Sequence, residues 1–123
     1  MDNLNVILEE IKSDVTWVAG LAHDVGAMNS QPICYDDLRE VNGYKLYLAS
    51  SGKLLAFVYP TTEGFRVVSS GKWATKAGVT GFVDKVDNSG WWGKPAVYWY
   101  FTLGDSGNYE RIVTHLASIA RVR

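Results

Sequence analysis

The sequence predicts an α+β fold in two layers, with an N-terminal amphipathic helix, an antiparallel meander of about five strands and a C-terminal helix. Apolar residues recur every three or four positions near each end of the chain, which is typical of helices with one buried face. Between these ends the repeat changes to two, in short runs separated by Gly, Ser and Pro. The runs leave no room for the crossover helices of a parallel sheet, so the strands should be antiparallel.

The length and composition fit a single domain over residues 1–123. A domain of this size buries about two thirds of the surface of its unfolded chain, which is enough for a core without covalent cross-links. Apolar residues make up 47% of the chain and charged residues 20%, so a folded domain is expected rather than a disordered segment.

The first helix is predicted over residues 3–25, with Gly26 as its stop. Gly20 weakens the helix by roughly 1 kcal/mol relative to alanine, so two shorter helices are the alternative. The same stripe spans three heptads and could pair helices between two copies of the chain, giving a homodimer. Packing on the chain's own sheet is the preferred interpretation. The stripe consists of Leu4, Ile7, Leu8, Ile11, Val15, Val18, Leu21, Ala22 and Val25.

Strands are predicted where side chains alternate in character. They cover residues 44–48, 53–59, 65–69, 79–86 and 96–103. Residues 27–32 are expected to form a loop, and residues 36–41 a short helical turn. Residues 70–78 are either a long loop or one helical turn, and residues 87–90 have the composition of a turn.

The last strand separates its side chains into two kinds. One face is uniformly apolar and should meet the helices, with Trp99 and Phe101 in the core. Tyr98 and Tyr100 lie on the other face, where a tyrosine ring can pack while its hydroxyl meets water or a ligand. The apolar face consists of Val97, Trp99, Phe101 and Leu103.

The C-terminal helix follows capping side chains in residues 104–107. Its apolar stripe consists of Tyr109, Ile112, Val113, Leu116, Ile119 and Ala120. The order of elements, with a GKLLAFVY strand, a GFRVV strand and a closing strand and helix, resembles small helix–meander–helix families such as the YjbR-like proteins. The resemblance rests on pattern over about the last 70 residues and transfers no site residue.

The charge is divided unevenly along the chain. Residues 1–40 hold eight acids against two bases, a net charge of −6, and residues 41–123 hold ten bases against five acids, a net of +5. This asymmetry indicates either attraction between the two parts within the fold or between copies, or a basic part that faces an anionic partner.

Familiar catalytic motifs do not occur in the sequence. Cys34 is the only cysteine, which excludes an internal disulfide and a thiolate cluster and fits a reducing compartment. His23 and His115 are the only histidines, and neither has a metal-ligand partner at helical spacing. A Cys34–His dyad assembled in space remains an alternative.

Asp36, Asp37 and Glu40 form the only carboxylate cluster in the sequence. Helix capping is the preferred role for these carboxylates. The alternative is a divalent ion held by Asp36 and Glu40 beside Lys45. No catalytic residue and no cofactor is assigned, and an enzyme is the less favoured interpretation.

Aromatic residues interleaved with bases give the stronger signal. Adjacent tryptophans in an extended stretch point to opposite faces, so Trp91 or Trp92 should reach solvent or a groove. Tryptophan and tyrosine dominate interface energetics, and together with lysine they also suit stacking on unpaired bases. The predicted partner-binding residues are Trp73, Lys72, Lys76, Trp91, Trp92, Lys94, Tyr98 and Tyr100.

The sequence therefore favours a non-enzymatic binding module whose partner is a protein, slightly ahead of single-stranded nucleic acid. The alternative is a small-ligand or metal-dependent pocket protein, a sensor or hydrolase, with its site between sheet and helices. No apolar run approaches the ~20 residues of a membrane span. The N-terminus carries acids where a secretory signal carries bases, so a cytoplasmic location is expected.

Overall fold

The computed structural model describes residues 2–38 and 41–123, with side chains from residue 15 onward. The elements follow one another as α1 (Asp2–Asn29), β1 (Ile33–Leu38), β2 (Gly43–Leu48), β3 (Leu54–Pro60), β4 (Gly64–Ser70), α2 (Gly71–Ala77), the single 3₁₀ turn η1 (Thr80–Phe82), β5 (Lys85–Trp91), β6 (Lys94–Thr102) and α3 (Ser106–Val122).

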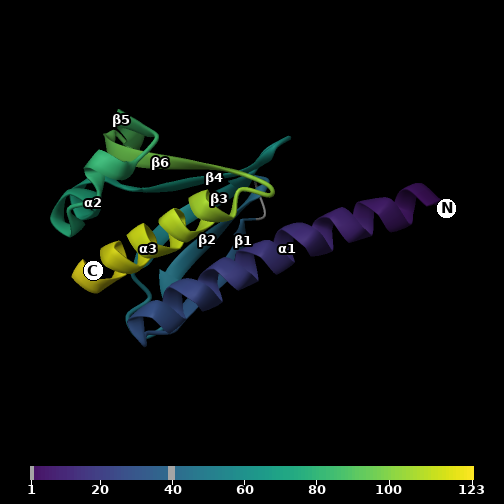
Figure 1. Ribbon diagram of the computed structural model, residues 1–123, viewed down its shortest axis with the longest axis horizontal. Coiled ribbons are helices and arrows are strands. Elements are labelled where there is room, and N and C mark those ends of the chain that lie inside the picture. Colours follow the sequence, from purple (N-terminus) through teal and green to yellow (C-terminus); the bar gives the residue numbers. More distant parts are fainter. Residues whose placement is uncertain (1, 39–40) are drawn as a thin grey trace.

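The six strands form one antiparallel sheet in the order β1-β2-β3-β4-β6-β5. Helices α1 and α3 pack against each other along one side of this sheet (Figure 1). The opposite side is called the outer face here. The predicted α+β fold is confirmed, with one strand more than the five expected.

The core lies between the sheet and the two long helices. Val18 and Leu21 of α1 and Leu116 of α3 are fully buried against the inner face. Trp99 is the largest fully buried side chain, and Phe101 is buried as predicted. Leu103 was expected beside them but is 63% exposed, because β6 ends at Thr102 and the chain turns away through Gly104 in the left-handed region.

Helix α1 is one continuous element, longer than the predicted 3–25 and not divided at Gly20. Gly26 does not stop it. The returning chain lies so close to Gly26 that a Cβ there would be 3.0 Å from the carbonyl oxygen of Gln31. The helix ends after Asn29, where Ser30 takes a φ of 54°. Asn29 Nδ2 donates to the Ala117 carbonyl at 2.8 Å, which ties the end of α1 to α3.

The segment expected to be a loop and a helical turn contains the edge strand β1. Tyr35 pairs with Leu46, and Asp36 pairs with Lys45 of β2. The helix-capping role predicted for Asp36 and Asp37 is therefore wrong, because both residues lie in a strand. Glu40 lies outside the described residues. Residues 33–38 form a strand because they pair with β2, and the local sequence pattern does not reveal this pairing.

The strand and turn predicted over residues 79–90 are displaced. Residues 80–82 form η1, and β5 begins only at Lys85. The predicted turn at 87–90 lies inside β5, where the register shifts between Asp87 and Trp91, so that three residues oppose one on β6. Asp87 Oδ1 accepts from the Ser89 amide at 3.0 Å, so the turn-forming side chains stabilise a bulge.

Of the two alternatives for residues 70–78, the helical one is confirmed, because Gly71–Ala77 form the short helix α2. Helix α2 ends at Ala77, and Gly78 caps it with a φ of 73° and an amide that donates to the carbonyls of Ala74 and Thr75. The described helices include none with the length and apolar character needed to span a membrane.

Candidate binding cleft

Three aromatic rings meet over the outer face of the sheet. The ring centroid of Phe57 lies 5.2 Å from that of Trp91 and 5.5 Å from that of Trp92, and the two indoles are 5.4 Å apart. The expectation that Trp91 and Trp92 point to opposite faces is wrong. Trp92 occupies the hairpin turn between β5 and β6 with a φ of 49°, and this turn brings both rings to Phe57.

Strand register builds the surface beside these rings. Phe57 of β3 lies opposite Val68 of β4, which lies opposite Tyr98 of β6. In the next row Tyr59 lies opposite Arg66. Side chains in directly opposed positions of adjacent antiparallel strands share one face of the sheet. These five residues form the floor of a cleft.

The cleft over this floor, called the outer cleft, has a volume of about 680 Å³. Leu38 and Val41 line it at the β1–β2 end, and Gly90, Trp91 and Trp92 line it at the β5–β6 hairpin. Lys45 is the remaining lining residue. The cleft therefore reaches from one end of the sheet order to the other.

Two glycines allow the backbone of β2 and β5 to lie close to the rings of the floor. A Cβ on Gly43 would lie 2.6 Å from a carbon of the Tyr59 ring, so that ring rests on the bare backbone of β2. A Cβ on Gly90 would lie 2.3 Å from the Tyr98 hydroxyl, so the bulge of β5 passes directly over Tyr98. Any side chain at these positions would displace a ring of the floor.

Arg66 supplies positive charge in the middle of the floor. Its guanidinium carbon lies 4.9 Å from the centroid of the Tyr59 ring, a cation–π contact. Its Nε is buried and has no hydrogen-bond partner among the described residues. Burial raises the pKa of Tyr59, and the charge of Arg66 partly opposes this rise.

Lys45 is the second cation of the outer cleft. Its Nζ lies 3.9 Å from Asp36 Oδ2, and both side chains are close to half exposed, so this ion pair is weak. Asp36 does not line the cleft. Among the described lining residues there are five aromatic rings, two cations and no carboxylate.

A second cavity of about 750 Å³, called the α2 cleft, lies between α2 and the β5–β6 hairpin. Trp91 and Trp92 line it from the other side, so the tryptophan pair separates the two clefts. Lys72, Lys94 and Arg123 are its cations, and its described lining residues include no Asp or Glu side chain.

Trp73 has a different role from Trp92. It packs against the core and is half-buried. Lys72, Lys76 and Arg123 each place a positive group between 4.7 and 5.1 Å from its ring centroid. Its ring is thus already engaged by the protein's own cations, whereas Trp92 is 76% exposed.

The predicted residues divide between the two clefts. Trp91, Trp92 and Tyr98 line the outer cleft, and Lys72, Trp73 and Lys94 line the α2 cleft with the same tryptophan pair. Lys76 and Tyr100 line neither cleft. The structure adds Phe57, Tyr59 and Arg66, which the sequence did not single out, and Lys45, which was named only beside the alternative ion site. For Phe57, Tyr59 and Arg66 the available signal was the alternation in strands 53–59 and 65–69, which places Phe57 and Tyr59 on one face and Arg66 apart from its buried neighbours.

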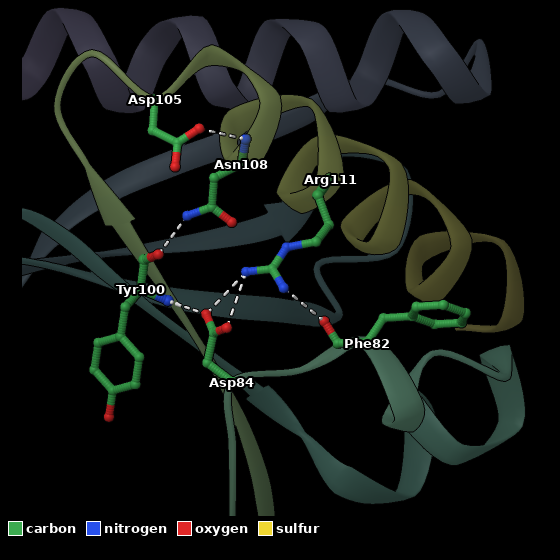
Figure 2. Close-up of polar contacts among 6 residues, drawn as sticks. All are labelled: Phe82, Asp84, Tyr100, Asp105, Asn108 and Arg111. Carbon is green, nitrogen blue, oxygen red and sulfur yellow. Dashed lines mark hydrogen bonds and ion pairs between the residues drawn. The ribbon is translucent and has the colours of Figure 1, made fainter.

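Tyr100 belongs to a polar cluster on the other side of β6 from β4 (Figure 2). Its amide donates to Asp84 Oδ2 at 2.8 Å, and its carbonyl accepts from Asn108 Nδ2. Arg111 Nη2 lies 3.0 Å from both carboxylate oxygens of Asp84. Side chains thus supply hydrogen-bond partners for the backbone of β6 where β5 no longer pairs with it.

The described residues show little that favours metal or nucleophile chemistry. They contain no group of three or more His, Cys, Asp or Glu side chains that could hold a metal ion. No hydrogen bond joins the described side chains of Cys34 and either histidine. His115 instead contacts the rings of Phe82 and Trp99.

Comparisons with protein-family models, with curated proteins and with solved structures find no match for this chain. The resemblance to the YjbR-like proteins therefore gains no support beyond the order of elements. The two clefts and the tryptophan pair between them carry the functional argument.

Proposed function

We propose that this protein is a non-enzymatic binding module that holds an anionic segment of a macromolecular partner against the outer face of its sheet. The observation that carries the proposal is the outer cleft, in which five aromatic rings and two cations meet without a carboxylate among the described lining residues.

The exposed tryptophan supports a partner that covers this region. Trp92 is 76% exposed, yet its ring is held by contacts with Phe57 and Trp91. A large ring that is already fixed loses little conformational entropy on binding, so most of its buried surface contributes to affinity. Tryptophan is also the residue most enriched among those that dominate interface energies.

The cation Arg66 on the cleft floor supports an anionic partner. Arg66 lies on a central strand and makes no ion pair with any described side chain. A guanidinium offers donors in a planar fork that fits carboxylate or phosphate oxygens. A protein and a nucleic acid both supply such groups.

The alternative, a sensor or hydrolase with a pocket between sheet and helices, has weaker support. That layer is occupied by fully buried side chains such as Leu46, Trp99 and Leu116. The cytoplasmic location expected from the sequence stays a prediction and fits either function.

Site-specific photo-crosslinking tests the proposal. A photoreactive phenylalanine analogue in place of Trp92 should form covalent adducts with a macromolecule in a cell extract, and Arg66→Gln in the same chain should suppress them. The matched control places the analogue at Phe82, which is also exposed but lines neither cleft. Adducts of equal yield at both positions, or none at position 92, would overturn the proposal.

A further inference from the structure

We infer that the segment bound in the two clefts is a single strand of nucleic acid, with bases stacked at the Trp91–Trp92 pair and phosphates on the cations to either side. This inference rests on the proposed function and names its ligand. Three features of the site favour this ligand over an acidic peptide.

The first feature is that the site lies on the face of the sheet. The backbone groups of β3 and β4 are used in pairing with their neighbouring strands. Extended peptides bind sheets chiefly by adding a strand at an edge. Where β6 extends past its pairing with β5, no added strand can pair at Tyr100, because its amide donates to Asp84 and its carbonyl accepts from Asn108. A ligand on the outer face therefore meets side chains, here rings and cations.

The second feature is the position of the cations relative to the tryptophan pair. Lys45 and Arg66 line the outer cleft, and Lys72, Lys94 and Arg123 line the α2 cleft on the other side of the pair. A nucleic acid strand carries a phosphate on each side of every base. A base stacked at the pair would place its flanking phosphates toward cations in both directions.

The third feature is the ring surface itself. Trp92 presents an exposed indole, and the half-buried rings of Tyr59 and Tyr98 line the floor of the cleft beside it. Every base has a flat face, so such a surface binds single strands with little dependence on sequence. A paired duplex does not expose these faces, so the inference predicts a preference for single strands.

Fluorescence anisotropy with labelled oligonucleotides tests the inference. The probes are a single-stranded DNA, an RNA of the same sequence, the matching DNA duplex and a polyglutamate peptide. We expect both single strands to bind more tightly than the duplex and the peptide. For about four phosphate contacts, raising the salt concentration from about 50 to about 200 mM should weaken single-strand binding roughly 50-fold.

Two variants with matched controls locate the binding. Trp92→Ala should weaken single-strand binding at least about fivefold, whereas Phe82→Ala should not change it. Lys94→Gln should reduce the salt slope by about 0.7, whereas Arg121→Gln, an exposed residue that lines neither cleft, should leave the slope unchanged.

Several results would overturn the inference. Binding of polyglutamate without binding of single strands would overturn it while leaving the proposed function intact, as would protein adducts at position 92 without oligonucleotide binding. Equal affinity for duplex, or single-strand binding that both variants leave unchanged, would also overturn it. Absence of every adduct and of all binding would remove the proposed function as well.

Discussion

Arg111 binds the carboxylate of Asp84 through one nitrogen, Nη2, which lies 3.0 Å from each carboxylate oxygen. Its Nη1 donates to the carbonyl of Phe82 at 3.3 Å, and the Asp84 amide donates to the carbonyl of Tyr98 at 2.8 Å. The contact fastens the chain before β5 to both α3 and β6 (Figure 2). It therefore fixes the base of the hairpin whose tip carries the tryptophan pair.

Breaking this ion pair should destabilise the fold. Arg111→Gln is expected to lower the free energy of unfolding by about 1–2 kcal/mol, because both side chains are only about one third exposed and share two hydrogen bonds. Denaturant unfolding measures the loss. In a double-mutant cycle with Asp84→Asn, a coupling energy near zero would contradict the assigned role. Arg121→Gln is the control and should change stability by less than about 0.5 kcal/mol.

A methyl group at Gly64 should be poorly tolerated. A Cβ there would lie 1.8 Å from the carbonyl oxygen of Phe101 on the paired strand, and backbone cannot move aside as a flexible side chain can. Gly64→Ala is expected to cost about 2–3 kcal/mol of stability. Gly20→Ala meets no atom within 4 Å and should stabilise α1 by about 0.5–1 kcal/mol. Thermal unfolding of the two variants should give shifts of opposite sign.

Two tryptophans should respond very differently to truncation. Trp99 is fully buried in the core, so Trp99→Ala is expected to cost about 3–5 kcal/mol. Trp92 is largely exposed, and the rings of Phe57 and Trp91 that it contacts are themselves only half-buried, so Trp92→Ala should cost less than about 1 kcal/mol. Urea titrations of the two variants measure these losses in the free energy of unfolding. A cost of several kcal/mol for Trp92→Ala would mean that the hairpin tip is structural rather than a free binding surface.

The stability of the protein should fall in mild acid because of His115. Burial lowers the pKa of this imidazole, and the charge of Arg111 lowers it further. The unfolded chain, with an ordinary pKa near 6.5, takes up the proton before the folded chain does. The stability is therefore fully present above pH 6.5 and is lost as the pH falls through the folded pKa.

Urea titrations at a series of pH values check this expectation. His115→Phe keeps a ring against Phe82 and Trp99 but cannot take up a proton, so it should lose less stability than the native chain between about pH 7 and pH 5. Thr114→Ala, an exposed neighbour on α3, is the control and should follow the native curve. Identical pH dependence for the Phe variant and the native chain would refute the role of His115.

Pairing of the N-terminal stripe between two copies of the chain, the alternative to packing on its own sheet, stays a prediction. The N-terminal part of α1 runs past the end of the sheet (Figure 1), and the side chains of residues 2–14 lie outside the described part of the chain. If copies pair through this stripe, sedimentation equilibrium shows a dimer that Leu8→Lys dissociates, because Leu8 belongs to the apolar stripe. Asn5→Lys adds the same charge off the stripe and should leave the dimer intact. A monomer at every concentration would contradict the prediction.

Local periodicity was sufficient for most of the fold. Helices α1 and α3 and the strands β2, β3, β4 and β6 were predicted because their buried faces repeat at the period of the element. Strand β1, which was not predicted, has no such pattern, because an edge strand is exposed along much of its length. The β5 segment was displaced because Asp87 and Ser89 form the same local hydrogen bonds in a bulge as in a turn.

The candidate site was only partly accessible to sequence reasoning. The sequence by itself determined that aromatic residues exceed what one strand can bury and that bases lie among them, because composition and alternation are properties of the chain alone. Only the tertiary structure decided that Trp92 and Trp91 meet Phe57 and that Arg66 lies on Tyr59 with no carboxylate partner among the described residues. The tryptophans and Phe57 are about 35 residues apart and meet through a left-handed turn, whereas Arg66 and Tyr59 are about 7 residues apart and meet through strand register. A local sequence pattern specifies neither the turn nor the register.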